Sequence, residues 1–164
     1  MSLKSKIDQI NTRQIARGAV TAALYAATAW ALAPISFGPT QLRVSEALTV
    51  LPVLFPEAPY GLFVGCILAN MAGGYGMLDI VFGSLATLLA AFATRKLAQQ
   101  PFLALLPPVV INAVVIGCML HFVAGVPFLL TAAQVGAGQI ASCYGLGLPL
   151  LYGLKKTRLA ETPA

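Results

Sequence analysis

Residues 56–94 read PEAPYGLFVGCILANMAGGYGMLDIVFGSLATLLAAFAT, and this stretch decides the fold class. It contains two apolar runs, 60–73 and 78–94, with only a glycine-rich segment between them. Glycine permits the unusual backbone angles of a tight turn, so this segment is a credible connection between two helices. The runs contain one charged residue, Asp79. The pattern therefore predicts two short transmembrane helices joined by a tight turn.

Proline and glycine divide the rest of the chain in the same way. The apolar runs are 18–35, 45–56, 60–73, 78–94, 101–122 and 128–154. Of the 164 residues, 59% are hydrophobic and only 9% are charged, and the mean hydropathy is +0.85. A soluble domain usually carries about 25% charged residues, because its surface faces water. The composition therefore predicts an all-α integral membrane protein, a compact bundle of six transmembrane helices.

The positions of the basic residues decide between six spans and five. Runs 45–56 and 60–73 are each too short to cross about 30 Å of hydrocarbon, and fusing them would leave five spans. With six spans and a cytoplasmic N-terminus, nine of the ten basic residues lie in the cytoplasm and only Arg43 lies outside. With five spans, four lie inside and six outside. Because cytoplasmic loops are enriched in Lys and Arg, six spans in the cell membrane are favoured.

This topology divides the chain into three parts. Residues 1–17 form a cytoplasmic N-terminal segment, 18–154 form the transmembrane substrate-binding domain, and 155–164 form a cytoplasmic basic tail. Both termini are expected in the cytoplasm.

Polar residues gather in the outer half of the predicted bundle. An ionisable or amide side chain at membrane depth is costly, so its position indicates function. The outer polar residues, and one residue about 10 Å deep in the last run, are predicted to bind a substrate. They are Trp30, Arg43, Glu46, Asn70, Tyr75, Asp79 and Gln134.

Structural roles stay open for the same residues. Glu46 and Asp79 fall in first helical turns, where a carboxylate can cap free N–H groups. Arg43 and Glu46 are three residues apart and can pair with each other. Asn70 can hydrogen-bond between helices. Trp30 fits an aromatic belt at the membrane surface as well as a stacking platform for a ligand.

Small residues recur along one face of the first run. Ala19, Ala23 and Ala27 are four residues apart, and a parallel stripe begins with Gly18 and Ala22. Small side chains at this spacing let another helix approach closely. The stripe either packs within the chain or docks on a separate membrane subunit, and the spacing alone leaves both alternatives open.

Catalytic motifs are absent from the sequence. There is no G-x-x-x-x-G-K-[ST] loop for ATP phosphates, no H-E-x-x-H, and no G-x-S-x-G. The chain has one His and five acidic residues, and these form no cluster with metal-ligand spacing. We therefore expect neither an enzyme nor a cofactor, and uphill transport would need energy from another polypeptide.

Two blocks of the sequence resemble a known family. Residues 31–52, ALAPISFGPTQLRVSEALTVLP, together with residues 56–91 of the stretch quoted above, are similar to the signature of the QueT family. The likeness extends from about residue 16 to residue 155, which is most of the chain.

The resemblance implies a substrate-binding S component of an energy-coupling factor (ECF) importer, an ABC transporter, with a six-helix fold. Such a component binds a micronutrient outside the cell and docks on a transmembrane coupling protein with two cytoplasmic ATPases. The substrate that the family implies is a queuosine precursor, a 7-deazaguanine such as the aminomethyl form. S components commonly contact the coupling protein through small residues of the first helix, which favours Ala19, Ala23 and Ala27 as the partner interface. No nucleic acid partner is implied.

The chemistry of a deazaguanine fits the predicted outer site. Its adjacent N–H groups suit a carboxylate acceptor, and an aminomethyl cation suits a second carboxylate. Glu46 and Asp79 are the candidates, and neither is assigned to one edge of the ligand. The alternative functions are an S component for another vitamin or nucleobase-like micronutrient, and a stand-alone small permease.

Overall fold

The structure, a computed structural model, describes residues 12–36, 42–73 and 76–157, and the regular elements in these ranges are all helices. In chain order they are α2 (Thr12–Ala31), α3 (Ala33–Ser36), η1 (Val44–Val53), α4 (Ala58–Gly73), η2 (Asp79–Gly83), α5 (Ser84–Lys96), η3 (Leu103–Leu105), α6 (Leu106–Ala124), α7 (Phe128–Ile140), η4 (Ala141–Gly147) and α8 (Leu148–Lys155). Segments η1 and η3 have the tighter 3-10 geometry, and η2 and η4 have the wider π geometry. The predicted all-helical fold class is confirmed for the described residues.

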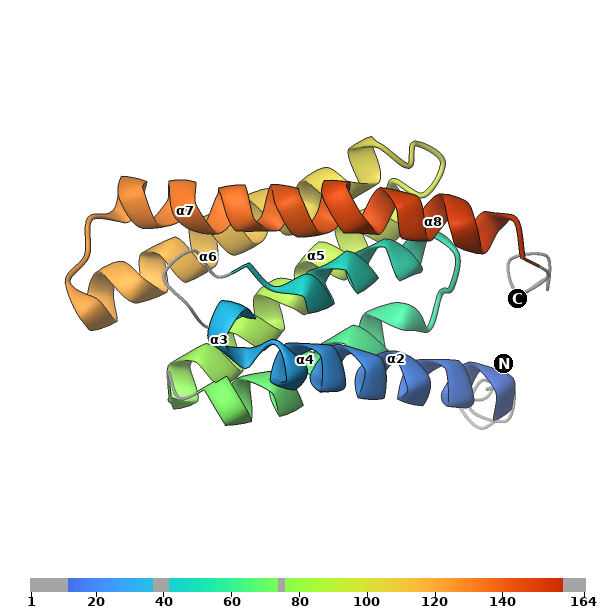
Figure 1. The fold of residues 1–164 in the computed structure, drawn as a ribbon, viewed down its shortest axis with the longest axis horizontal. Coiled ribbons are helices and arrows are strands. Elements are labelled where there is room, and N and C mark those ends of the chain that lie inside the picture. Colours follow the sequence, from blue (N-terminus) through green and yellow to red (C-terminus); the bar gives the residue numbers. More distant parts are fainter. Residues whose placement is uncertain (1–11, 37–41, 74–75, 158–164) are drawn as a thin grey trace, which may run out of the picture.

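The helices run back and forth along one long axis (Figure 1). Helix α2 runs in one direction, η1 in the opposite direction, and α4 in the first direction again. The units η2–α5, η3–α6 and α7–η4–α8 continue this alternation. The start of α2 and the end of α8 lie at the same end of the bundle, which we call the terminal end. Helices α2, α4 and α6 finish toward the opposite end, which we call the far end. The helix order therefore follows that of the predicted apolar runs.

Helices α2 and α4 pack closely because glycine leaves no side chain between them. A Cβ atom placed on Gly61 would lie 2.5 Å from the carbonyl oxygen of Gly18. One placed on Gly65 would lie 2.8 Å from the carbonyl oxygen of Ala22. Small residues at a helix interface allow such close backbone approach. Gly18 and Ala22, which belong to the parallel stripe of small residues, therefore serve packing within the chain.

Two apolar clusters hold most of the helices together, and a third joins α6 to α7. The first, around Tyr25 and Leu62, joins α2 to α4 and α5. The second, around Val50, Leu105 and Leu151, joins η1 to η3, α6 and α8. All five side chains are fully buried. The short segment η1 is thereby held inside the bundle, although it has only ten residues.

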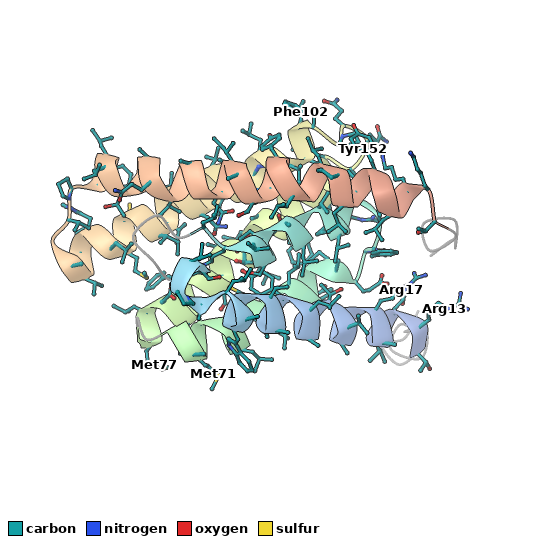
Figure 2. The ribbon with its side chains drawn as sticks, viewed as in Figure 1. Arg13, Arg17, Met71, Met77, Phe102 and Tyr152 are labelled. Atoms are coloured by element: carbon teal, nitrogen blue, oxygen red, sulfur yellow. The ribbon has the colours of Figure 1, made fainter. Side chains whose placement is uncertain are left out.

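The outside of the bundle is largely apolar. Figure 2 shows Met71, Met77, Phe102 and Tyr152 on the outside of the bundle. Phe122 is even more exposed, at 84%. A soluble protein rarely exposes large contiguous apolar patches, so this surface fits a lipid environment.

The long helix Leu103–Ala124 is, among the described helices, the one that is long and apolar enough to cross a membrane by itself. Val44–Val53 and Ala58–Gly73 are apolar but shorter. Prolines stand at the start of α6, where their missing N–H groups cost nothing, and Gly125 ends it with a φ of 68°. The length of this span is thus set by local sequence.

Candidate functional site

A group of polar side chains is buried between the helices, toward the far end. Arg43 immediately precedes η1 and Glu46 is in its first turn, whereas Asn70 comes from the last turn of α4 and Asp79 from the start of η2. Each is at most 5% exposed. We define the polar cluster as these four residues and two that contact them, listed here together: Tyr25, Arg43, Glu46, Asn70, Asp79 and Asn112. Buried polar groups are costly unless they are paired, so the partners of each residue indicate its role.

Arg43 pairs with Asp79 across the bundle. The Arg43 Nη2 atom lies 3.4 Å from Asp79 Oδ2, and the two side chains are 5% and 0% exposed. The pair joins the segment before η1 to the start of the helix that contains α5. Removing one partner of a buried ion pair leaves an uncompensated charge, so each of the two residues is needed to keep the other stably buried. The sequence had suggested Glu46 as a possible partner of Arg43, but the ion pair of the structure is with Asp79.

Glu46 is held by two donors from other helices. The Tyr25 hydroxyl on α2 donates to Glu46 Oε1, and the Asn112 side-chain amide on α6 donates to Oε2 at 3.4 Å. Sequence reasoning missed Tyr25 as a member of this site. No periodic pattern marked it, because it is a single tyrosine among alanines, and its burial beside Ala22 and Ala29 is known only from the structure.

Asn70 contacts Asp79 through the main chain. Its Nδ2 atom donates to the Asp79 carbonyl oxygen at 2.9 Å and lies 3.5 Å from the Cys66 sulfur. Helix α5 reaches the same sulfur through the Thr87 hydroxyl at 3.4 Å. The polar cluster thus connects α4 with η2 and α5, and Asp79 contacts both Arg43 and Asn70.

Two of the other predicted site residues, Trp30 and Gln134, are not among these hydrogen-bonded residues. Trp30 is on α2 with its side chain 50% exposed, and Gln134 is partly exposed on α7. Tyr75 lies outside the described residues. Gln139, further along α7, is buried and accepts a hydrogen bond from the Cys143 thiol at 3.5 Å. The assignment of all seven predicted residues to the substrate site, including Trp30, Tyr75 and Gln134, stays a prediction.

The two stripes of small residues on α2 face different surroundings. Gly18 and Ala22 lie against α4, as described above, whereas Ala19, Ala23 and Ala27 are exposed. The exposed stripe therefore has no part in the contact that Gly61 and Gly65 make possible, and it remains accessible to another protein.

Two surface grooves, which the sequence did not predict, flank α2 toward the terminal end. The first has a volume of about 480 Å³, lies between α2 and α4, and is lined partly by Ala19 and Tyr60. The second has a volume of about 640 Å³ and lies between α2, η1 and α8. Arg13 and Arg17 line it, and Figure 2 shows both at the terminal end. Neither groove is lined by a member of the polar cluster.

The chemistry available to the polar cluster is recognition by charge and hydrogen bonds. It offers a guanidinium, two carboxylates, two amides and a phenol in a water-poor interior, where such contacts are strong. Within the residues that the structure describes, no group of three or more His, Cys, Asp or Glu side chains is placed to hold a metal ion. A small polar ligand with several hydrogen-bonding atoms is the partner that this set of groups fits.

Replacing Tyr25 by phenylalanine should destabilise the bundle. The change removes the donor to Glu46 Oε1 and leaves a buried carboxylate with one partner fewer. Hydrogen bonds to charged groups contribute about 1.5–3 kcal/mol, so we expect a loss of this size in the free energy of unfolding. Denaturant unfolding followed by circular dichroism in detergent measures it. Tyr152→Phe is the matched control, because Tyr152 is exposed, and an equal loss in both variants would contradict the assigned contact.

The family model described as QueT transporter matches residues 15–156. The queuosine precursor transporter QueT of Lactococcus lactis subsp. cremoris (strain MG1363) is 28% identical over 148 residues, which cover 81% of this chain and 87% of the relative. No solved structure matches the chain. The matched region includes every described member of the polar cluster.

Proposed function

The chain belongs to the QueT transporter family, and from this premise we propose that it is the substrate-binding S component of an ECF importer for a queuosine precursor. The family is one of transporters, so the chain is a membrane transport protein and not an enzyme. The relative from Lactococcus lactis carries the name queuosine precursor transporter, which supports the substrate class. The aminomethyl form of 7-deazaguanine is the specific ligand that we propose.

The buried polar cluster is the observation that carries this proposal. Four of its members come from α4, η2 and η1 with the residue before it, which meet toward one end of the bundle, and each is at most 5% exposed. Such a concentration of ionisable groups inside a largely apolar bundle is costly and indicates a substrate site. A deazaguanine has the N–H donors and the carbonyl acceptor that a carboxylate, an amide and a guanidinium can bind.

The proposed topology has six spans with both termini in the cytoplasm. It is supported by the gathering of Arg13 and Arg17 at the terminal end (Figure 2), together with Lys155 as the last residue of α8, which ends there. Cytoplasmic segments are enriched in basic residues. In this orientation the far end, toward which the polar cluster lies, faces the outside of the cell.

The proposed partner interface is the exposed stripe of Ala19, Ala23 and Ala27. All three side chains are exposed, and Ala19 also lines the groove between α2 and α4. A transmembrane coupling protein with two ATPases would dock there and supply the energy of ATP hydrolysis. Small side chains allow a partner helix to approach closely, which favours this face over one with larger side chains.

Titration of the purified protein against a panel of ligands tests the proposed function. We expect tight binding of the aminomethyl deazaguanine and of its parent deazaguanine by isothermal titration calorimetry, and no heat with common vitamins. Co-purification with the two ATPases tests the ECF assignment separately. Binding of a vitamin and of no deazaguanine would contradict the proposed substrate. Uptake into liposomes by the chain alone would contradict the ECF mechanism.

A further inference from the structure

Two buried oxygen atoms in the polar cluster have no partner among the described residues. They are Asp79 Oδ1 and Asn70 Oδ1. The side chains are 0% and 1% exposed, so bulk water does not reach them. Buried polar atoms in native proteins are nearly always hydrogen-bonded, and an exception calls for an explanation such as a missing ligand. The Asn70 oxygen can only accept hydrogen bonds, and so can Asp79 Oδ1 when its carboxylate is ionised.

The orientation of the Asn70 amide is fixed by its other contact. Its nitrogen donates to the Asp79 carbonyl oxygen at 2.9 Å, and that carbonyl cannot donate in return. A flipped amide would place two acceptors against each other, so the oxygen must be the uncommitted atom.

Gly83 brings the two side chains to one place. A Cβ atom built on Gly83 would lie 2.7 Å from Asn70 Nδ2 and 3.2 Å from Asp79 Oδ1. Both side chains therefore border the same point of the helix that contains η2 and α5. Because Gly83 has no side chain, the Asn70 amide and the Asp79 carboxylate can both occupy the space beside its backbone.

Glu46 differs from Asp79 in this respect. Both of its carboxylate oxygens accept hydrogen bonds, one from Tyr25 and one from Asn112. Asp79 commits only Oδ2, to Arg43. The two carboxylates that the sequence offered as equivalent candidates thus have different amounts of unused hydrogen-bonding capacity.

We infer that Asp79 and Asn70 together accept hydrogen bonds from two adjacent N–H groups of the ligand. Glu46 holds the polar cluster in place and does not bind these N–H groups. The inference rests on the proposed function, because it assigns the donor edge of the deazaguanine, its ring N–H and exocyclic amine, to this pair. Binding then satisfies both uncommitted oxygens. A ligand that lacks the exocyclic amine leaves one of them buried and unpaired, and a site of this kind strongly rejects such an analogue.

Selectivity between two ligands tests the inference. Deazaguanine and its analogue without the exocyclic amine are titrated by calorimetry against the full-length wild-type protein and against Asn70→Leu. We expect the wild type to prefer deazaguanine by about 100-fold or more. In Asn70→Leu the preference should fall at least about tenfold. The exocyclic amine of deazaguanine then has no Asn70 oxygen to donate to, so an analogue without this amine loses less. Asn70→Ser, which removes the amide but keeps a small polar side chain, should give the same shift if the leucine variant does not fold.

Asn112→Leu is the matched control, since it makes the same change at another buried member of the cluster. Asn112 supports Glu46, so this variant and Glu46→Gln should weaken both ligands by the same factor and keep the wild-type preference. An unchanged preference in both Asn70 variants, or a preference lost in Glu46→Gln, overturns the inference while deazaguanine binding still stands. Failure of the wild type to bind any deazaguanine overturns the proposed function, and the inference with it.

Discussion

Replacing Asp79 by leucine should abolish ligand binding and greatly destabilise the protein. The change removes one proposed ligand acceptor, and it breaks the ion pair in which Asp79 lies 3.4 Å from the buried Arg43 guanidinium. Breaking a buried ion pair by removing one partner costs about 3–5 kcal/mol. We therefore expect a large fall in the midpoint of thermal unfolding in detergent, and no measurable heat on titration with deazaguanine.

The double variant Arg43→Met/Asp79→Leu separates these two effects. Replacing both members of a buried pair by apolar residues of similar volume is often neutral or stabilising. Most of the unfolding midpoint should therefore return, whereas ligand binding should not. If binding returned together with stability, Asp79 would act only through the fold, and its assignment to the substrate site would be wrong.

Replacing Gly65 by leucine should prevent the protein from accumulating in folded form. A Cβ atom at this position would lie 2.8 Å from both the Ala22 carbonyl oxygen and Tyr25 Cβ, and 3.0 Å from Ala22 Cα. The nearest atoms are largely backbone, so they cannot move aside without separating α2 from α4. Overpacking a tight core by single methylene groups already costs about 1–3 kcal/mol, and leucine adds more than this.

Expression level and size-exclusion profile in detergent measure this effect. The milder Gly65→Ala should give a folded protein with a lower unfolding midpoint and weaker ligand binding, because pressure on Tyr25 disturbs its bond to Glu46. Gly145→Leu is the control, since a Cβ on Gly145 meets nothing within 4 Å. Equal yields of the Gly65 and Gly145 leucine variants would show that the close approach of α2 and α4 is dispensable.

Much of the helix order was predictable from the sequence. Apolar runs broken by Pro and Gly predicted where the helices lie, because these breakers act locally and need no knowledge of packing. The family was also predictable from residues 31–52 and 56–91, and the family match over residues 15–156 confirms it. The predicted division between residues 17 and 18 stays a prediction, and helix α2 (Thr12–Ala31) runs across it.

The partners inside the polar cluster were not predictable in the same way. Spacing along the chain suggested that Arg43 pairs with Glu46, but the ion pair reaches Asp79, 36 residues away. Tyr25 escaped notice because a single tyrosine in a helix rich in alanine carries no periodic signal, and its role depends on Glu46 arriving from η1. Contacts of this kind depend on how helices rotate against one another, which hydropathy does not specify.

Trp30 also gives the protein a built-in optical reporter. It is the one tryptophan in the chain, and its side chain is half exposed on the outside of α2. In vesicles of brominated lipid, its emission should be quenched to a degree that depends on how deep the bromine atoms lie along the acyl chains. The same emission should change on adding deazaguanine only if the indole ring contacts the ligand. One fluorescence experiment therefore distinguishes a Trp30 that lies at the membrane surface from one that lines the substrate site.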